Sequence, residues 1–224
     1  MVSGRRLFVS DIHGQVEALG RLLERMEYKA GQDRLILLGD YVGAGGESLR
    51  CLRLVRELCA GGAIALLGNH DQALIDCLAS GDTPRALPAI YAYMPELAAE
   101  IVQAHADFLP FLRGLPLWYE DHDVIAVHAG FNPDLPDWHL STREEFTSMR
   151  EPFLSRSTDV GRMVIFGHTP CERLHGSAAV YFGQGRIGID GGAGHGRQLN
   201  GLVYDGQAYT ALAVAVNVQE PAGG

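Results

Sequence analysis

Six side chains with the chemistry of metal ligands stand where apolar runs of this chain end. They follow stretches such as "RLFVS", "RLILLG" and "VIAV", and the six are Asp11, His13, Asp40, Asn69, His128 and His168. Carboxylate, amide and imidazole ligands without thiolates suit Mn²⁺, Fe or Zn²⁺, and a carboxylate shared by two ions makes a dinuclear site. Asp11 and His13 alternate, so an extended strand would turn both side chains to one face. The set predicts a metal centre.

Two metal ions would bring a specific chemistry to this centre. Held roughly 3.5–4 Å apart, they can carry a bridging hydroxide as nucleophile and neutralise a phosphoryl group during its transfer. The ligand set therefore predicts phosphoester hydrolysis. Each of the six residues would be unremarkable alone, and the hypothesis depends on all of them standing at strand ends.

The elements that must position these residues alternate between strand and helix in the first third of the chain. Apolar runs of strand length precede stretches whose apolar residues recur at helical spacing. The pairs are 6–11 with 15–28, 34–40 with about 46–60, and 63–71 with the helix that follows it. Because such units build sheets covered by helices, the polar strand endings should gather at one edge, where α/β sheets place their chemistry.

The second half of the chain changes to strands separated by glycine-containing turns. Residues 123–130, 163–170 and later runs such as "LVYDGQAYTAL" have strand character. A second sheet stacked on the first is the economical arrangement. The expected fold is α/β (α+β), a four-layer α-β-β-α sandwich of two mixed sheets flanked by helices. We expect one domain over 1–218, a helical cap at about 72–115 and a disordered tail at 219–224.

Composition excludes several classes of function. The chain has 224 residues, 47% of them apolar, and 18 basic against 27 acidic residues give a net charge of −9. That balance disfavours extended nucleic-acid binding. Since no apolar segment of signal or transmembrane length occurs, we expect a cytoplasmic protein without membrane contact. Four cysteines without C-x-x-C spacing are expected to be free thiols, and the sequence leaves the oligomeric state open.

Five ordered motifs, "DIHG", "GD", "GNH", "VHAG" and "FGHTP", resemble the phosphoprotein phosphatase branch of the calcineurin-like metallophosphoesterases. This branch includes small bacterial and phage serine/threonine phosphatases and symmetric diadenosine tetraphosphate hydrolases. The resemblance implies that Asp11 and His13 hold the first ion and that Asp40 bridges both. It implies a second ion on Asn69, His128 and His168. Two divalent ions are expected, with Mn²⁺ favoured and Fe, Zn²⁺ or Ni²⁺ as alternatives.

The resemblance also assigns roles in catalysis and substrate binding. His70, which follows Asn69 in "GNHD", corresponds to the general acid that gives a proton to the leaving oxygen. Asp40 is a catalytic residue through its bridging position, and Asn69 contacts substrate as well as metal. In "MREPFL", Arg150 stands where bacterial members bind phosphate oxygens, although an arginine at a helix end could equally pair with a neighbouring carboxylate.

One loop departs from the family pattern. The family writes "GDYVDRG", in which the second Asp orients the general acid and the Arg binds phosphate, whereas this chain has Gly43 and Ala44 there. We expect turnover of a simple monoester to be about 10- to 1000-fold lower, on the order of 1.4–4 kcal/mol. The tetraphosphate hydrolases also lack this Asp but keep the Arg. Either the two small residues widen the pocket, or Arg197 or an arginine of 142–156 fills the gap.

The main functional hypothesis is a dinuclear phosphatase of the phosphoprotein-phosphatase kind, acting on phosphoproteins or small phosphomonoesters. The alternatives are a phosphodiesterase or diadenosine tetraphosphate hydrolase, and a metal-bearing regulatory module with weakened catalysis. Expected partners are accordingly a phosphoprotein or a small phosphorylated or nucleotide substrate. Structural roles are expected for the remaining polar candidates: helix capping for Asp71, a supporting or structural role for Asp190, and surface or packing positions for His105, His122, His139, His175 and His195.

Overall fold

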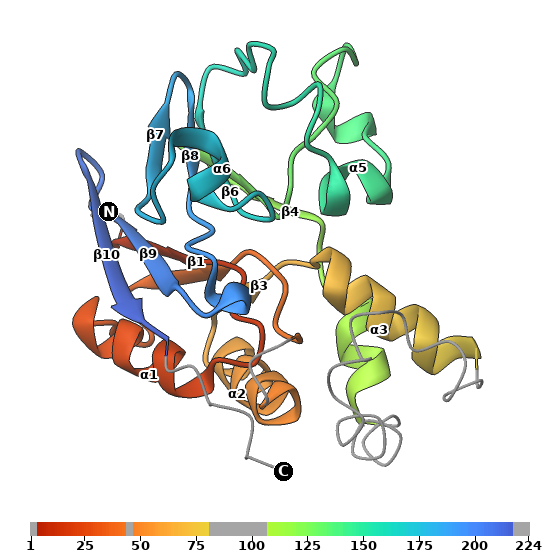
Figure 1. The fold of residues 1–224 in the computed structure, drawn as a ribbon, viewed down its shortest axis with the longest axis vertical. Helices are drawn as coiled ribbons and strands as arrows, with labels where there is room; N and C mark the ends of the chain where they lie inside the picture. The colour runs from red at the N-terminus through yellow and green to blue at the C-terminus, as the bar shows by residue number, and fades with distance from the viewer. Residues whose placement is uncertain (1–3, 44–46, 81–106, 217–224) are drawn as a thin grey trace.

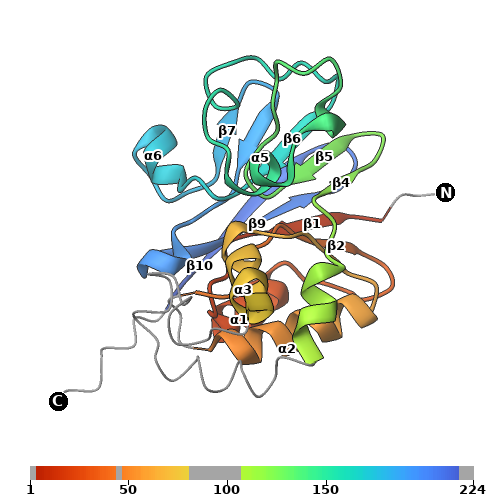
Figure 2. The same cartoon turned by 90° about the vertical axis from the view of Figure 1, so that its right-hand side faces the viewer.

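The computed structural model describes residues 4–43, 47–80 and 107–216. Two five-stranded sheets lie face to face, with helices against the outer face of the first (Figures 1 and 2). The first sheet has the order β10-β9-β1-β2-β3 and the second β4-β5-β6-β8-β7. Both sheets are mixed, because parallel and antiparallel pairs occur in each. The expected four-layer sandwich is confirmed.

The first sheet is built from both ends of the chain. Its strands are β1 (Arg6–Val9), β2 (Arg34–Leu37), β3 (Ile64–Ala65), β9 (Gln198–Tyr204) and β10 (Tyr209–Ala215). The first three are parallel, and β9 pairs antiparallel with β1. The assignment of "LVYDGQAYTAL" to the second sheet was wrong, because this hairpin completes the first sheet beside β1. Strand propensity alone does not say which edge a late hairpin will join.

The second sheet comes from the middle of the chain. Its strands are β4 (Trp118–Glu120), β5 (Val124–Val127), β6 (Met163–Phe166), β7 (Tyr181–Gly183) and β8 (Arg186–Gly188). β5, β6 and β8 run parallel, so their carboxyl ends lie at one edge. The loops that leave this edge carry His128, His168 and Asp190. Short elements cover the outer face: η1 (Trp138–Leu140), α5 (Arg143–Ser148) and α6 (Cys171–His175).

Strand alternation divides the apolar residues among three clusters. In β1, Phe8 faces the second sheet, where its cluster includes Val124 and Ile165, while Leu7 and Val9 face the helices. Those helices are α1 (Val16–Arg25), α2 (Ser48–Ala60) and α3 (Asn69–Ser80). A third, aromatic cluster with Phe131, Phe146 and Phe153 lies on the outer side of the second sheet. This is the period of two expected for sheets buried on both faces.

The expected cap at about 72–115 is only partly within the described residues. Its residues 107–113 are helical, and Phe108, Leu109 and Leu112 belong to the same core cluster as residues of α1 and α2. Residues 81–106 and the tail at 219–224 lie outside the described part, so the cap and tail stay predictions. None of the four cysteines forms a disulfide within the part of the chain that the structure describes, as expected. Among the described residues, no helix has the length and apolar character needed to cross a membrane.

Candidate active site

The first ligands lie in turns just beyond the strands of the first sheet. Asp11, His13 and Asp40 have left-handed backbone angles, with φ of 53°, 48° and 56°. The amide of His13 donates to the carbonyl of Asp40 at 2.8 Å, and that of Asp11 to Gly39 at 3.1 Å. The idea that an extended strand turns Asp11 and His13 to one face was wrong, because β1 ends at Val9. Paired turns, held in strained conformations, bring them together instead.

Asp71 fixes the turn that carries Asp40. Its buried carboxylate accepts from the backbone amides of Asp40 at 2.8 Å, Tyr41 at 3.0 Å and Gly68 at 3.0 Å. Burial raises the pKa of Asp71 to about 6, although these amides favour the charged form. The sequence suggested helix capping. In the structure this carboxylate also ties α3 to the loop after β2, which sets the position of Asp40 relative to His70.

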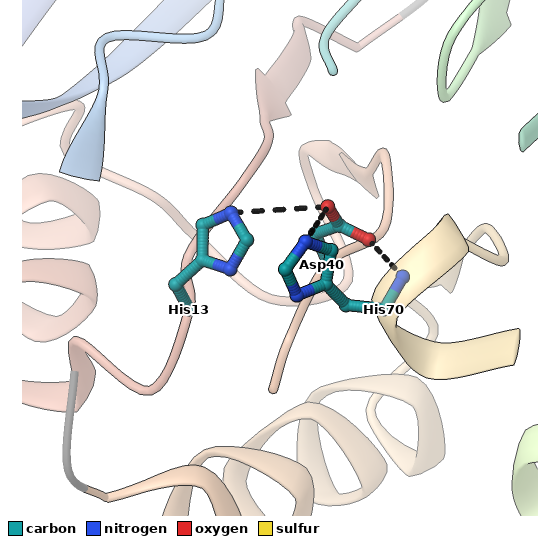
Figure 3. A group of neighbouring side chains, drawn as sticks. All are labelled: His13, Asp40 and His70. Atoms are coloured by element: carbon teal, nitrogen blue, oxygen red, sulfur yellow. Dashed lines mark hydrogen bonds and ion pairs between the residues drawn. The ribbon is translucent and has the colours of Figure 1, made fainter. Parts of the chain in front are cut away.

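Asp40 lies at the centre of three imidazoles. Its Oδ2 is 3.8 Å from Nε2 of both His13 and His70, and its Oδ1 is 3.5 Å from Nε2 of His128. Oδ1 also accepts the backbone amide of His70 at 2.9 Å (Figure 3). Burial and the nearby carboxylate of Asp11 raise the pKa of Asp40 well above its usual range. A cation bound here would offset the free-energy cost of burying the charged carboxylate, because it would compensate the negative charge.

A second set of donors meets at Asn69, the first residue of α3. Its Oδ1 is 3.1 Å from Nε2 of His128 and 2.8 Å from Nδ1 of His168. The carboxylate of Asp11 accepts the backbone amide of His168 at 3.0 Å, and this bond links the two sheets. Four residues from four strand-end loops thus converge where the sheet edges meet.

The donor atoms fit two divalent ions that share Asp40. His13, Asp40 and His70 offer ligand atoms within 4.8 Å of one another, and so do Asp40, His128 and His168. His13 and His128 place Nδ1 against the carbonyls of Val42 and Leu38, which favours the tautomer with a free lone pair on Nε2. Asp11 is not part of either group, but its Oδ1 lies 3.9 Å from Nε2 of His13. Oxygen and nitrogen donors without thiolate suit the expected metals.

Burial keeps the imidazoles of the site neutral. It lowers the pKa of His13 and His168 to about 3 and that of His70 and His128 to about 4. Neighbouring histidines lower these values further. Neutral imidazole is the form that binds metal, so at neutral pH these rings do not need to lose a proton first.

His70 lacks the partner that the family pattern would give it. Its Nδ1 is buried and meets no hydrogen-bond partner within the described residues. The ring packs edge-on against His13, with centroids 4.6 Å apart. The sequence resemblance implies that an Asp at the position of Gly43 would orient His70, and this chain has no side chain there.

Gly43 does not open a wider pocket, as one of the two hypotheses proposed. A Cβ atom built there would lie 2.3 Å from Nδ1 of His13, and one at Gly194 would lie 2.7 Å from Cδ2 of the same ring. The imidazole of His13 is therefore packed between two residues without side chains. The side chain of His13 fills the space beside Gly43. Ala44 lies outside the described residues.

Arg150 is the arginine of 142–156 that touches the site. Its Nη2 donates to the carbonyl of His168 at 3.4 Å. Burial raises the pKa of Asp11 and lowers that of His128, and the charge of Arg150 makes a smaller contribution that lowers both. The other candidates bind elsewhere: Arg143 donates to Gln72, Arg156 to Asp134, and Arg197 pairs with Glu172 at 2.6 Å. Arg150 thus lies beside the candidate centre, whereas Arg197 is paired with Glu172 one loop away.

Sequence reasoning undervalued the loop after β8. Asp190 is buried, and its carboxylate accepts a hydrogen bond from the amide of Gly192 at 2.8 Å. Burial is the main cause that raises the pKa of Asp190, and the charge of Asp11 raises it further. The next turn, η2 (Ala193–His195), lays Gly194 on His13, and His195 adds a minor contribution to the lowering of the pKa of His70 by burial and His128. The glycines of 191–196 were the available signal.

The other histidines have no link to the centre. His122 has 87% of its side chain exposed, and His139 stacks on Trp138 with centroids 3.8 Å apart. His175 is exposed and bonds the carbonyl of Cys171. These three match the surface or packing positions expected of them, and His105 lies outside the described residues.

Comparison with known proteins identifies the family. The profile described as calcineurin-like phosphoesterase matches residues 4–188. The chain belongs to this family. The dinuclear type of centre that the family uses is consistent with the two donor groups around Asp40. This is the family that the sequence motifs resembled.

Relatives of this metallophosphoesterase favour one of the alternatives considered above. It is 35% identical over 139 residues to a symmetrical bis(5′-nucleosyl)-tetraphosphatase of Dechloromonas aromatica, covering 61% of this chain and 46% of that protein. The chain spans about half the length of the curated relatives it matches. A solved structure of a candidate diadenosine tetraphosphatase has a TM-score of 0.73 and 27% identity, covering 95% of this chain and 94% of the other. The structure of a metallophosphoesterase from Sphaerobacter thermophilus has a TM-score of 0.61 and 25% identity, and the match covers 95% of this chain and 89% of the other.

These relatives correct the ranking of the functional hypotheses. The serine/threonine-phosphatase-like hypothesis was the main one, and tetraphosphate hydrolysis was an alternative. The similar proteins are named for the alternative, which fits better. The absence of an Asp at position 43, a feature that the sequence resemblance also gives to tetraphosphate hydrolases, agrees with this alternative.

Proposed function

We propose that this chain hydrolyses the phosphoanhydride bonds of bis(5′-nucleosyl) tetraphosphates or closely related nucleotide polyphosphates. The observation that carries the proposal is the buried Nδ1 of His70 without a partner. The names of the similar proteins support it.

The physical argument concerns the leaving group. An alkoxide leaving from a phosphoserine or phosphothreonine ester needs a proton, so a phosphatase for such esters depends on an oriented general acid. A phosphate leaving from an anhydride is a much weaker base and departs without full protonation. His70 has a depressed pKa and no carboxylate to orient it. This environment suits a hydrogen-bond donor to an anhydride oxygen better than an acid for an alcohol.

We assign the metal ligands as the resemblance implies. Asp11, His13 and Asp40 would hold one divalent ion, and Asn69, His128 and His168, again with Asp40, the other. Mn²⁺ is the favoured metal. Bound ions would supply an activated nucleophile and charge neutralisation for the phosphoryl group.

The protein's own groups supply the rest of the chemistry. Arg150, beside the carbonyl of His168, would bind non-bridging phosphate oxygens, and Asn69 would contact the substrate. His70 would donate a hydrogen bond from Nε2 to the oxygen between the reacting and leaving phosphates. Asp71 would hold Asp40 and α3 in register. A cytoplasmic location and a single domain over 1–218 stay predictions alongside this proposal.

The test is a comparison of turnover on the purified, Mn²⁺-loaded protein. The substrates are diadenosine tetraphosphate, a phosphothreonine peptide and p-nitrophenyl phosphate, with Asp40→Asn as the blank. We expect the highest kcat/KM for the tetraphosphate. A preference for the phosphothreonine peptide would restore the phosphatase hypothesis, and no turnover above the blank would favour a regulatory module.

A second comparison isolates His70. We expect His70→Ala to lower kcat on the phosphothreonine peptide, whose alkoxide leaving group needs a proton, by at least about tenfold, and to lower it less on the anhydride. The control His122→Ala removes an exposed histidine and should leave both unchanged. Equal losses on the anhydride and the ester would contradict the leaving-group argument.

A further inference from the structure

A cavity of about 340 Å³ lies between α6 and the η2 loop, and it carries the positive groups Arg173 and Arg197. Its wall also includes His195 and Glu172. Among the roles assigned above, none uses this cavity. Its volume is at the small end of the range of about 300–1,000 Å³ typical of ligand pockets. It would take part of a nucleotide and not a whole dinucleotide.

Three chain segments run from the surroundings of the metal centre to this cavity. Pro170 lines the cavity shortly after His168 in the sequence, and Gly191 and Gly192 line it directly after the buried Asp190. In η2, Gly194 packs on His13 while the next residue, His195, lines the cavity. The cavity therefore neighbours the centre.

The charge of the lining suits phosphate. Two arginines face one glutamate there, which leaves a positive surplus in a protein of net charge −9. Arg197 and Glu172 pair at 2.6 Å, but their side chains are 47% and 42% exposed. An exposed pair of this kind contributes little to stability. A phosphate, which guanidinium groups bind in bidentate fashion, can therefore replace the carboxylate at small cost.

We propose that this cavity binds the distal phosphates of the nucleotide polyphosphate, so that Arg173 and Arg197 determine specificity for long phosphate chains over simple monoesters. The inference rests on the proposed function. It also assigns Arg197 a role different from the one considered from sequence, because the residue meets the far part of the substrate and does not replace the arginine missing at position 44. Glu172 would compete with the substrate for Arg197.

The experiment measures KM and kcat on diadenosine tetraphosphate and p-nitrophenyl phosphate, using the Mn²⁺-loaded chain. We expect the R173A/R197A double variant to raise KM for the tetraphosphate about tenfold or more and to keep kcat/KM for p-nitrophenyl phosphate within about twofold. The matched control is R21A/R25A, which removes the same charge from a cavity beside α1 that shares no segment with the centre. This control should leave KM and kcat unchanged for both substrates.

Glu172→Gln gives a second measurement of opposite sign. Because it frees Arg197 from its carboxylate, it should lower KM for the tetraphosphate, and this remains informative if the double variant folds poorly. The inference is overturned if the variants change kcat/KM equally for both substrates or leave the KM for the tetraphosphate unchanged. Failure of the proposed function differs: the wild-type chain would then cleave p-nitrophenyl phosphate but not the tetraphosphate, and both ideas would fall.

Discussion

Replacing Gly43 by alanine should damage the centre by displacing His13. The new Cβ would start 2.3 Å from Nδ1 and 3.0 Å from Cγ of His13, whereas ordinary contacts begin near 3.4 Å. The ring must therefore move by about 1 Å, and a shift of that size at a reacting centre can cost about 100-fold in rate. It would also break the contact of Nδ1 with the carbonyl of Val42. We expect turnover to fall about 100-fold, with fewer than two metal ions bound.

The control is Gly62→Ala. Gly62 has φ of +100° and no atom within 4 Å of an added Cβ, so this change brings a similar backbone strain without the collision. Each variant should lose about 1–3 kcal/mol of stability from strain, but only the Gly43 variant should lose turnover. The assays are p-nitrophenyl phosphate hydrolysis, metal content by mass spectrometry and thermal unfolding. Wild-type turnover with two metals in Gly43→Ala would refute the packing argument. By the same reasoning, Gly43→Asp cannot simply restore the family's carboxylate.

Three further outcomes are expected. Asp71→Asn keeps the side-chain volume but turns an N–H group toward backbone amides whose hydrogen bonds the carboxylate accepts in the wild type. The free energy of unfolding should therefore fall by about 2 kcal/mol and the Tm by about 4–8 °C in calorimetry. An unchanged Tm would mean that the loop keeps its conformation without Asp71. Arg150→Ala should raise KM for every phosphate substrate tested, because it lies at the centre itself, and a change confined to the tetraphosphate would move its role to the distal cavity. Mn²⁺ affinity should fall by at least about tenfold per pH unit below pH 6, because metal binding must displace protons from Asp11, whose pKa burial raises to about 6, and from Asp40, whose pKa burial also raises, while the neutral histidines do not compete. Calorimetric titration at pH 7 and pH 5 would detect this, and equal affinities would contradict it.

The fold class, and the gathering of polar side chains at the sheet edges, could be predicted from sequence because both depend on local patterns. Apolar runs that end in Asp, Asn or His mark strand ends, and parallel strands bring their carboxyl ends to one edge whatever the details of packing. The same locality explains the errors. The turn conformations of Asp11 and His13 depend on backbone bonds to the loop after β2, about thirty positions away, and no pattern within the segment reports them.

Tertiary structure alone decided what the departure at Gly43 means. From the sequence, a missing side chain suggests empty space, whereas in the fold the ring of His13 fills that space. The cavity lined by Arg173 and Arg197 likewise combines segments that follow different strands. Residue types and their order determined which chemistry the chain can carry, since ligand chemistry belongs to the side chains. Which groups contact one another was decided by long-range packing, because those distances exist only once both sheets are assembled.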